Sequence, residues 1–512
     1  MTRPERRLRA VSSIVFVLAI LCGCRDADDE TRRAVPLPVS GRLVLTGVTI
    51  VDTLDGSLAP DMSLVAEAGR IVRIAPSDGL EPDASAQTID ATGQFVVPGY
   101  LDMHVHALGE GDPADHLALM LASGITGYRQ MRGTAELLAA RRAGTLAQSF
   151  DEPALLAMPG EVLTPFLAGD PEEAAEVVRA QQAAGADFIK VALASSPVFS
   201  ALLAEAARND IPLVGHVPFD VGVVAASDQG MRSIEHLGPS NGILVACSSD
   251  EEALREQAPK LPAFIMEPPF EIPFADALTR WLLDGIIINP ASQTDAAEFA
   301  RTRRIVDTFS EGKCRDVAAR FVANGTWQVP TLIRIRSSQL AFEPEFRNDP
   351  DLRYVDAATI ASWQKVTEKF EARLSDDDRQ ILRDAYALDL ELVRLLDAAG
   401  VKMLAGSDVV GAGWLVPGFS LHHEFDELAK AGLPPLRVLQ MATIRGAEFL
   451  GRESSLGRVA VGHDADLVLL DANPLESVEN LHAIRAVVRA GFYRDRANLD
   501  ALRAKVESEM KP

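Results

Sequence analysis

The sequence predicts an α/β protein, a (β/α)8 barrel that carries a small β-domain formed from both ends of the chain. Eight apolar, strand-like runs alternate with amphipathic helical stretches through the middle of the chain, which is typical of parallel strands covered by helices. Short β-branched runs separated by turn dipeptides stand before and after that middle. We therefore expect the β-domain in residues 41–94 plus 452–495 and the barrel in 95–451.

The first forty residues predict export. A cationic start, MTRPERRLRA, precedes the apolar residues 11–21, a run too short for the roughly twenty residues that span a bilayer but suited to a signal peptide. The following LCGC resembles a bacterial lipobox, which would make 1–24 the signal peptide and Cys24 the lipidated first residue of the mature chain. A plain signal peptide with a chance cysteine is the alternative. With 25–40 as a flexible tether, we expect a lipoprotein in the periplasm or cell envelope, attached to the membrane by its lipid.

Composition limits the partners. The 512 residues are 47% hydrophobic, enough for one large and one smaller core. The formal net charge of −23 repels phosphate backbones, so nucleic acid is excluded as a partner. Apart from Cys24, the cysteines of the mature chain are Cys247 and Cys314, and export permits a disulfide between them; two buried free thiols are the equal alternative.

The barrel strands are expected in chain order, with two long helical insertions. The segments 238–326 and 336–400 follow the sixth and seventh strands, where loops build substrate clefts. Peripheral decoration or a homo-oligomer contact is the alternative for both. A C-terminal helix is expected in 496–512. The expected strands are 95–104, 125–131, 154–159, 187–193, 212–217, 232–237, 327–335 and 401–408.

Six side chains at expected strand ends suggest metal chemistry. In QFVVPGYLDMHVH, His104 and His106 are two residues apart and so share one face of a strand, where a divalent metal would explain the pair. His216 and His236 end later strands, and a barrel gathers its strand ends around one mouth. Asp408 ends the eighth. Lys190 ends the fourth strand, where an unpaired cation is costly. One alternative is that Lys190 pairs with a carboxylate. The other is that its unprotonated amine adds carbon dioxide to form a carbamate, which can bridge two metal ions.

These motifs resemble those of the amidohydrolase superfamily. PGYLDMHVH is similar to its PGxxDxHxH signature, and the lysine, two histidines and aspartate follow in the order of the binuclear members with a carboxylated lysine. The similarity extends over nearly all of residues 41–495, includes LAGSDVV, and is greatest to the Xaa-Pro dipeptidase and imidazolonepropionase-like group around GADFIKV. The chain departs from the pattern at Gln130, where related chains usually carry an acid, and in its long segment after strand six. Both departures leave the substrate open.

The resemblance implies a β-sandwich as the small domain and a ligand set for two divalent ions. His104, His106 and Asp408 would hold one ion, His216 and His236 the other, and N6-carboxylated Lys190 would bridge them together with a water or hydroxide. Zinc suits these ligands best, and manganese or cobalt could substitute. Asp408 would be catalytic, accepting the proton of the water. The implied reaction is attack of the bridging hydroxide on an amide or peptide C–N bond of a small substrate, such as a dipeptide or an N-acyl amino acid.

Other functions stay open at this point. One is hydrolysis of a cyclic amide, ester or lactone; a mononuclear deaminase is another, but deaminases of this superfamily lack the bridging lysine. A catalytically inactive, anchored binding lipoprotein is the non-enzymatic alternative, against which the intact ligand set argues. Arg334, expected with Arg336 at the end of strand seven, could bind a substrate carboxylate or form a salt bridge. The remaining candidates for substrate contact are His116, Tyr128 and His423, with packing or capping as the alternative for each.

Overall fold

Strands from both ends of the chain share one sheet in the structure, a computed structural model that describes residues 41–79, 83–109, 112–146, 149–257, 285 and 287–510. The predicted signal peptide, Cys24 and the tether lie outside these residues. The sheet comprises β1 (Leu43–Val51), β2 (Leu58–Glu67), β3 (Arg70–Pro76), β4 (Gln87–Asp90), β5 (Phe95–Pro98), β13 (Leu467–Leu470), β14 (Ile484–Arg489) and β15 (Phe492–Asp495).

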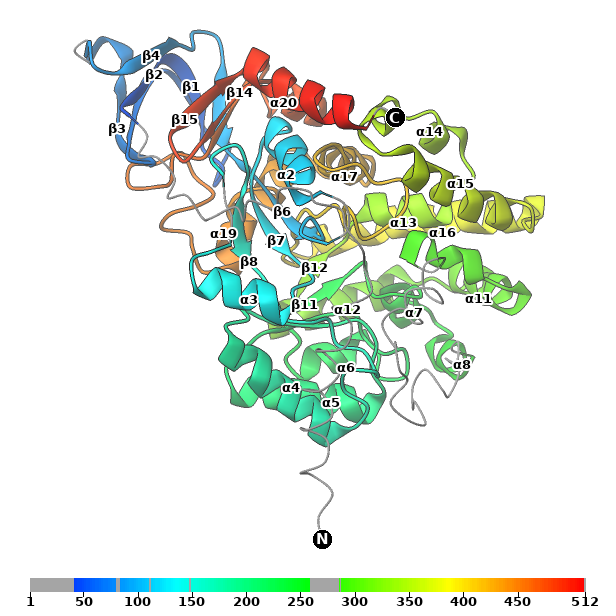
Figure 1. The fold of residues 1–512 in the computed structure, drawn as a ribbon. Coiled ribbons are helices and arrows are strands. Elements are labelled where there is room, and N and C mark those ends of the chain that lie inside the picture. The colour runs from blue at the N-terminus through cyan, green and yellow to red at the C-terminus, as the bar shows by residue number, and fades with distance from the viewer. Residues whose placement is uncertain are drawn as a thin grey trace, which may run out of the picture.

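The order of this sheet is β15-β14-β13-β5-β1-β2-β3, with β4 paired to β1. The antiparallel pair of β13 and β5, in which Leu467 is opposite Pro98, joins the two ends of the chain. In Figure 1 the blue N-terminal strands and the red C-terminal strands accordingly lie side by side. Alternating residues such as Leu43, Leu45 and Leu467 form its apolar core. Division of this sheet into a β-sandwich stays a prediction.

The strands of the middle segment are parallel and form two sheets. One has the order β6-β7-β8 and the other β12-β11-β10-β9. Isolated parallel bridges lie beside the strands at Leu163 with Val191, Gln328 with Met403 and Val105 with Val409. Closure of these strands into a barrel stays a prediction. The strands are β6 (Tyr100–Val105), β7 (Ile125–Gln130), β8 (Ala154–Ala157), β9 (Ile189–Val191), β10 (Leu213–Gly215), β11 (Ser233–Glu235) and β12 (Trp327–Val329).

Three expected strands differ from the structure. The run 95–104 divides at Gly99 between β5 and β6, because a Cβ there would lie 2.0 Å from Thr126 Oγ1 and only glycine permits so close a crossing. The run 327–335 is a strand only to Val329, since Pro330 cannot donate to a ladder and helix α13 (Leu332–Gln339) follows. The run 401–408 carries a bridge at Met403 instead of a continuous strand.

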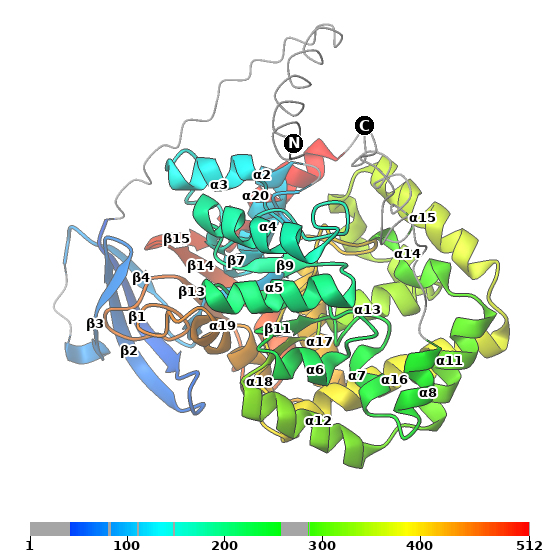
Figure 2. The ribbon, with the colours of Figure 1, turned by 90° about the horizontal axis from the view of Figure 1, so that it is seen from below.

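Helices surround the parallel strands. In both ribbon views the eight-stranded sheet lies on one side of the strands and the helices of the second insertion lie on the other (Figure 2). Among the described residues, none of the helices combines the length and apolar character needed to cross a bilayer. The other helices are α2 (Pro113–Ala122), α3 (Ala135–Arg142), α4 (Pro171–Ala184), α5 (Ser196–Arg208), α6 (Val223–Asp228), α7 (Gly242–Ala246), α8 (Glu251–Glu256), α11 (Ala296–Asp307), α12 (Glu311–Asn324), α14 (Pro344–Arg347), α15 (Ala357–Glu371), α16 (Asp376–Ala398), α17 (Phe419–Lys430), α18 (Pro435–Met441), α19 (Ile444–Phe449) and α20 (Arg496–Glu509). Short 3₁₀ helices are η2 (Ser77–Gly79), η3 (Pro290–Gln293), η4 (Pro350–Tyr354) and η5 (Val478–His482).

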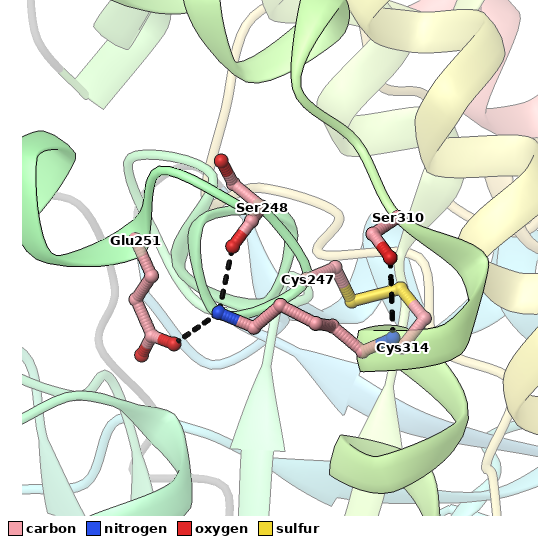
Figure 3. Close-up of a disulfide and its surroundings, with 6 residues drawn as sticks. Cys247, Ser248, Glu251, Ser310 and Cys314 are labelled. Carbon is pink, nitrogen blue, oxygen red and sulfur yellow. Dashed lines mark hydrogen bonds and ion pairs between the residues drawn. A yellow bond between two sulfur atoms is a disulfide. The ribbon is translucent and has the colours of Figure 1, made fainter.

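A disulfide joins the ends of the first insertion. Cys247, directly after α7, is bonded to Cys314 in α12, with their Cα atoms 4.5 Å apart (Figure 3). Lys313, the neighbour of Cys314, donates from Nζ to Ser248 O at 2.7 Å and to Glu251 Oε2 at 2.8 Å. Of the two alternatives left open for these cysteines, the structure has the disulfide.

Candidate metal centre

Four imidazoles, one lysine and one aspartate meet at the carboxyl ends of the parallel strands. His104 lies near the end of β6, and Lys190 lies in β9. His216 and His236 directly follow β10 and β11, and Asp408 lies next to the bridge of Val409 with β6. His104, Lys190 and Asp408 are buried, and the other three are half-buried. The structure thus brings together all six residues expected as metal ligands.

Asp408 connects the histidines of this cluster. Its Oδ1 lies 3.2 Å from Nε2 of both His104 and His106. The ring centroids of His104 and His236 are 4.7 Å apart, and those of His236 and His216 are 5.2 Å apart. Ligand atoms of His104, His236 and Asp408 all lie within 4.8 Å of one another, a spacing that one ion could fill.

Glycine permits the close approach of two of these strands. A Cβ on Gly215 would lie 2.2 Å from Val191 O and 3.0 Å from Lys190 Cδ. Its φ of +123° also disfavours any side chain. Gly215 therefore lets β10 pack against β9 immediately before His216, so that His216 and Lys190 share the same mouth.

The Nδ1 atoms of three imidazoles lie within hydrogen-bond distance of acceptor oxygens. Nδ1 of His104 lies 2.7 Å from Glu235 Oε2, and Nδ1 of His216 lies 3.0 Å from Ala192 O. Nδ1 of His236 lies 2.6 Å from Thr331 Oγ1, whose own proton goes to Pro330 O. Each Nδ1 therefore donates, and each Nε2 keeps the lone pair that metal ligation requires.

Burial keeps three of the four imidazoles uncharged. It lowers the pKa of His216 to about 3, with the Lys190 charge as the next cause. Burial also lowers the pKa of His106 and holds that of His236 well below the usual value. The same effect lowers the pKa of Lys190 to about 8, which makes its neutral amine more accessible than that of an exposed lysine.

The donor atoms fit a cation. Within the described part of the chain, Lys190 Nζ and His104 Nε2 are buried without a hydrogen-bond partner. In its neutral form His104 points an acceptor nitrogen at a carboxylate oxygen of Asp408, an arrangement that a cation between them stabilises. Burial works to raise the pKa of Asp408, but His236 and His104 hold it well below its usual value, so this carboxylate is ionised. Imidazole and carboxylate ligands suit zinc.

Glu235 and Arg129 form a buried ion pair behind His104 that the sequence analysis did not identify. Arg129 Nη2 lies 3.1 Å from Glu235 Oε1, and both side chains have no exposed surface. Arg129 Nε also donates to Met103 O, and Ser233 Oγ donates to Glu235. Against the effect of burial, Arg129 and His104 hold the pKa of Glu235 well below its usual value. The acid directly before His236 in the run RSIEHL was the available signal.

Asp102 is a second residue that was missed. Its Oδ1 accepts from Ser407 N at 3.0 Å, and its Oδ2 accepts from Ser407 Oγ at 2.6 Å. Burial raises its pKa to about 6. Asp102 thereby ties β6 to the residue before Asp408, and its place in the PGYLDMHVH motif was the signal.

Three residues in or beside the cluster have a left-handed backbone conformation. His236, Thr331 and Asp408 have φ values of 56°, 46° and 56°, a left-handed conformation that costs energy for residues other than glycine. Each of these residues either belongs to the cluster or holds one of its members. Strain of this kind persists where the surrounding structure determines the conformation, as it does at functional sites.

Two of the arginines considered for substrate contact, Arg334 and Arg336, lie in helix α13. Arg334 lies in α13, where its Nε donates to Asp408 Oδ2 at 3.1 Å; it does not flank the strand end as expected. Arg336, also in α13, points to Glu345 and Glu427.

The other three candidates do not contact the six. Tyr128 is buried in the core of β7, where burial and Glu152 raise its pKa. His116 is on α2, with Nδ1 3.3 Å from Ala107 O. His423 is on α17 and is half-buried. Of the candidates for substrate contact, only Arg334 touches the cluster.

Parallel strands that present imidazoles, a lysine and an aspartate at one end define an α/β protein with a metal-ligand set. The family profile described as "Amidohydrolase family" matches residues 390–492. An imidazolonepropionase from Symbiobacterium thermophilum is 24% identical over 432 residues, which cover 81% of this chain and 85% of that protein.

Solved structures agree in fold. Bottromycin amidohydrolase is 24% identical with a TM-score of 0.65, and the match covers 91% of this chain and 90% of that one. A Xaa-Pro dipeptidase with bound methionine in the active site is 17% identical with a TM-score of 0.56, covering 89% of this chain and 100% of that one. The fold is TIM-barrel-like. The comparisons thus place an amidohydrolase-family segment at residues 390–492 within a chain whose fold is similar to that of amidohydrolases.

Proposed function

We propose that this chain is a binuclear, zinc-dependent hydrolase of amide bonds in small substrates such as dipeptides or N-acyl amino acids. The observation that carries the proposal is the grouping of four imidazoles, Lys190 and Asp408 at one end of the parallel strands, where ligand atoms of His104, His236 and Asp408 lie within 4.8 Å of one another. The Nδ1 atoms of His104, His216 and His236 make hydrogen bonds, so their Nε2 atoms are available as metal ligands.

His104, His106 and Asp408 would hold one ion, and His216 and His236 would hold the other. The equal distances from Asp408 Oδ1 to the two histidine nitrogens support the first group. Lys190 would bridge the two after carboxylation, in which the neutral amine adds carbon dioxide and releases a proton to leave an anionic carbamate. A buried Nζ without a hydrogen-bond partner among the described residues suits this role better than a structural ammonium does.

Two divalent ions, when bound, supply an acidified water and a polarised scissile carbonyl. The protein's own groups then position the reactants and move the proton. Asp408, ionised and next to His104 and His106, accepts the proton of the attacking water and passes it to the leaving nitrogen. Glu235 fixes the ring of His104, and Thr331 fixes that of His236.

A cyclic amide is the second candidate substrate. A Xaa-Pro dipeptidase is among the structural neighbours, which favours a linear amide. A relative that matches 81% of this chain is an imidazolonepropionase, whose name denotes a ring substrate, and this favours the second candidate.

A substrate screen separates the two candidates. The purified enzyme, loaded with zinc in bicarbonate, would be assayed by mass spectrometry against dipeptides, N-acyl amino acids, imidazolones, cyclic ureides and lactones. Asp408→Asn serves as the inactive control. Hydrolysis of linear amides that the control lacks would support the proposal. Turnover of rings alone would replace it with the second candidate, and no turnover of either set would overturn both.

We also infer export and lipid attachment through Cys24. The disulfide between Cys247 and Cys314 supports this, because disulfides persist in oxidising compartments. Metabolic labelling with a fatty-acid analogue tests it: label on the wild-type chain and none on Cys24→Ser would support anchoring. Equal labelling of the two chains, or none, would refute it.

A further inference from the structure

Arg334 is a buried arginine, and among the described residues one of its guanidinium nitrogens, Nη1, has no hydrogen-bond partner. Its Nε donates to Asp408 Oδ2 at 3.1 Å, and its Nη2 donates to Ile287 O at 3.0 Å. Within the described part of the chain, its Nη1 is buried and makes no hydrogen bond. The residue is 9% exposed, so water satisfies little of the guanidinium. A buried cationic donor without an acceptor is costly and indicates an acceptor that the protein does not supply.

The neighbouring Arg336 has a different arrangement. It lies two residues further along α13 and directs Nη2 to Glu345 and Nη1 to Glu427. Arg334 instead makes a single contact with its acid, and the other oxygen of Asp408 faces His104 and His106. A purely structural arginine–carboxylate pair favours two parallel hydrogen bonds, which this pair lacks.

Asn289 adds an independent observation beside Arg334. It lies two residues after Ile287, whose carbonyl binds Arg334, and it immediately precedes η3, which packs against α13. Asn289 is 1% exposed, and both polar atoms of its side chain lack hydrogen-bond partners among the described residues. Arg334 therefore has an unused guanidinium nitrogen next to Asp408, and Asn289 has an unused amide two residues along the chain from the carbonyl that holds Arg334.

The start of α13 is held rigidly. Glu424 Oε2 accepts from Ile333 N at 2.8 Å, and Thr331 binds His236. The same turn of chain thus fixes both a proposed metal ligand and Arg334. A ligand group bound by Arg334 would be placed accurately relative to the proposed metal ligands.

We propose that Arg334 binds a carboxylate of the substrate through Nη1, with Asn289 as an additional donor, so that the enzyme selects amides that carry a free carboxylate near the scissile bond. This inference rests on the proposed function and names the substrate class of that site. A carboxylate accepts the two unused donors, and a planar guanidinium is suited to it. Both a dipeptide and a ring amide with an acidic side chain satisfy the requirement.

Matched substrate pairs test this inference. An N-acyl amino acid or dipeptide and its C-terminal carboxamide would be compared in the zinc-loaded wild type, Arg334→Met and Arg334→Lys. Arg383→Met is the control, because Arg383 is half-exposed and pairs with Glu343 away from Asp408. We expect the wild type to favour the carboxylate in kcat/KM by about ten- to hundredfold, the usual range for one charged hydrogen bond. Arg334→Met should reduce this ratio to near one, Arg334→Lys should restore part of it, and Arg383→Met should leave it unchanged.

The ratio separates selection from structural support. If Arg334 only held Asp408 in place, Arg334→Met would slow both substrates equally, and the unchanged ratio would overturn the inference. Equal turnover of both substrates by the wild type would also overturn it and leave the proposed function intact. If neither is cleaved, the proposed function fails, and binding of the same two compounds by calorimetry decides the inference. A carboxylate preference that Arg334→Met abolishes supports it, and equal or absent binding refutes it.

Discussion

Replacing Glu235 with glutamine removes one negative charge from the buried network behind His104 and changes the volume of the side chain little. In the wild type, Glu235 Oε2 lies 2.7 Å from His104 Nδ1, and its two oxygens lie 3.1 and 3.2 Å from Arg129 Nη2. The glutamine amide keeps one acceptor for these donors. When this acceptor serves His104, Arg129 is a buried cation that keeps Met103 O as its acceptor.

Two magnitudes follow from this geometry. Removal of one partner from a fully buried ion pair costs about 3–5 kcal/mol of stability. Loss of the group that orients a metal-binding histidine typically weakens metal affinity about ten- to hundredfold, which corresponds to about 1.4–2.7 kcal/mol. We therefore expect Glu235→Gln to fold, to melt at a lower temperature and to bind zinc more weakly in the same protein.

Zinc affinity would be measured by competition with a chromophoric chelator, and stability by thermal unfolding without metal. Glu205→Gln is the matched control, because Glu205 is also buried and paired, with Arg179 and Arg208, but belongs to α5. This control should lose stability and keep its zinc affinity. A folded Glu235→Gln protein that binds zinc within about twofold of the wild type would refute the proposed role of Glu235.

Three further predictions concern the bridge, the disulfide and a buried acid. Lys190→Ala should abolish activity, and short carboxylic acids should restore part of it by replacing the carbamate; full activity in the variant would contradict the bridge. Cys314→Ser should lower the unfolding free energy by about 4 kcal/mol on the chain-entropy account, since the disulfide spans 67 residues, and an unchanged melting temperature would contradict this. Burial raises the pKa of Asp389 to about 7, and Gln339 is its hydrogen-bond partner. Between about pH 4 and pH 7 the folded protein keeps a proton on Asp389 that the unfolded chain releases. The free energy of unfolding therefore falls as the pH rises through this range. Asp389→Asn should raise the melting temperature at pH 8, where the gain is at most about 4 kcal/mol, and change it little at pH 4; equal effects at both pH values would contradict this.

Much of the fold followed from local patterns in the sequence. Apolar runs located the seven parallel strands, and β-branched runs located the strands at both chain ends that share one sheet. The strand boundaries that the sequence predicted wrongly depend on tertiary contacts. The crossing at Gly99 is set by Thr126, and the helix in place of the end of the run 327–335 is capped by Glu424, which is distant in sequence.

The candidate site shows the same division. His104 and His106 could be recognised because period-two alternation puts them on one face, and the later ligands end recognisable strands. The pairing of Glu235 with Arg129 joins residues 106 positions apart, and that of Arg334 with Asp408 joins residues 74 apart. No local pattern specifies contacts of this range, so these partners required the structure.

The metal content of the purified protein tests the central claim most directly. Protein loaded with zinc in bicarbonate and freed of weakly bound ions would be measured by mass spectrometry for zinc per chain. Our account expects two zinc ions per chain in the wild type and fewer than two in a folded Asp408→Asn variant. A wild type that retains no zinc, or a variant that retains as much as the wild type, would contradict it.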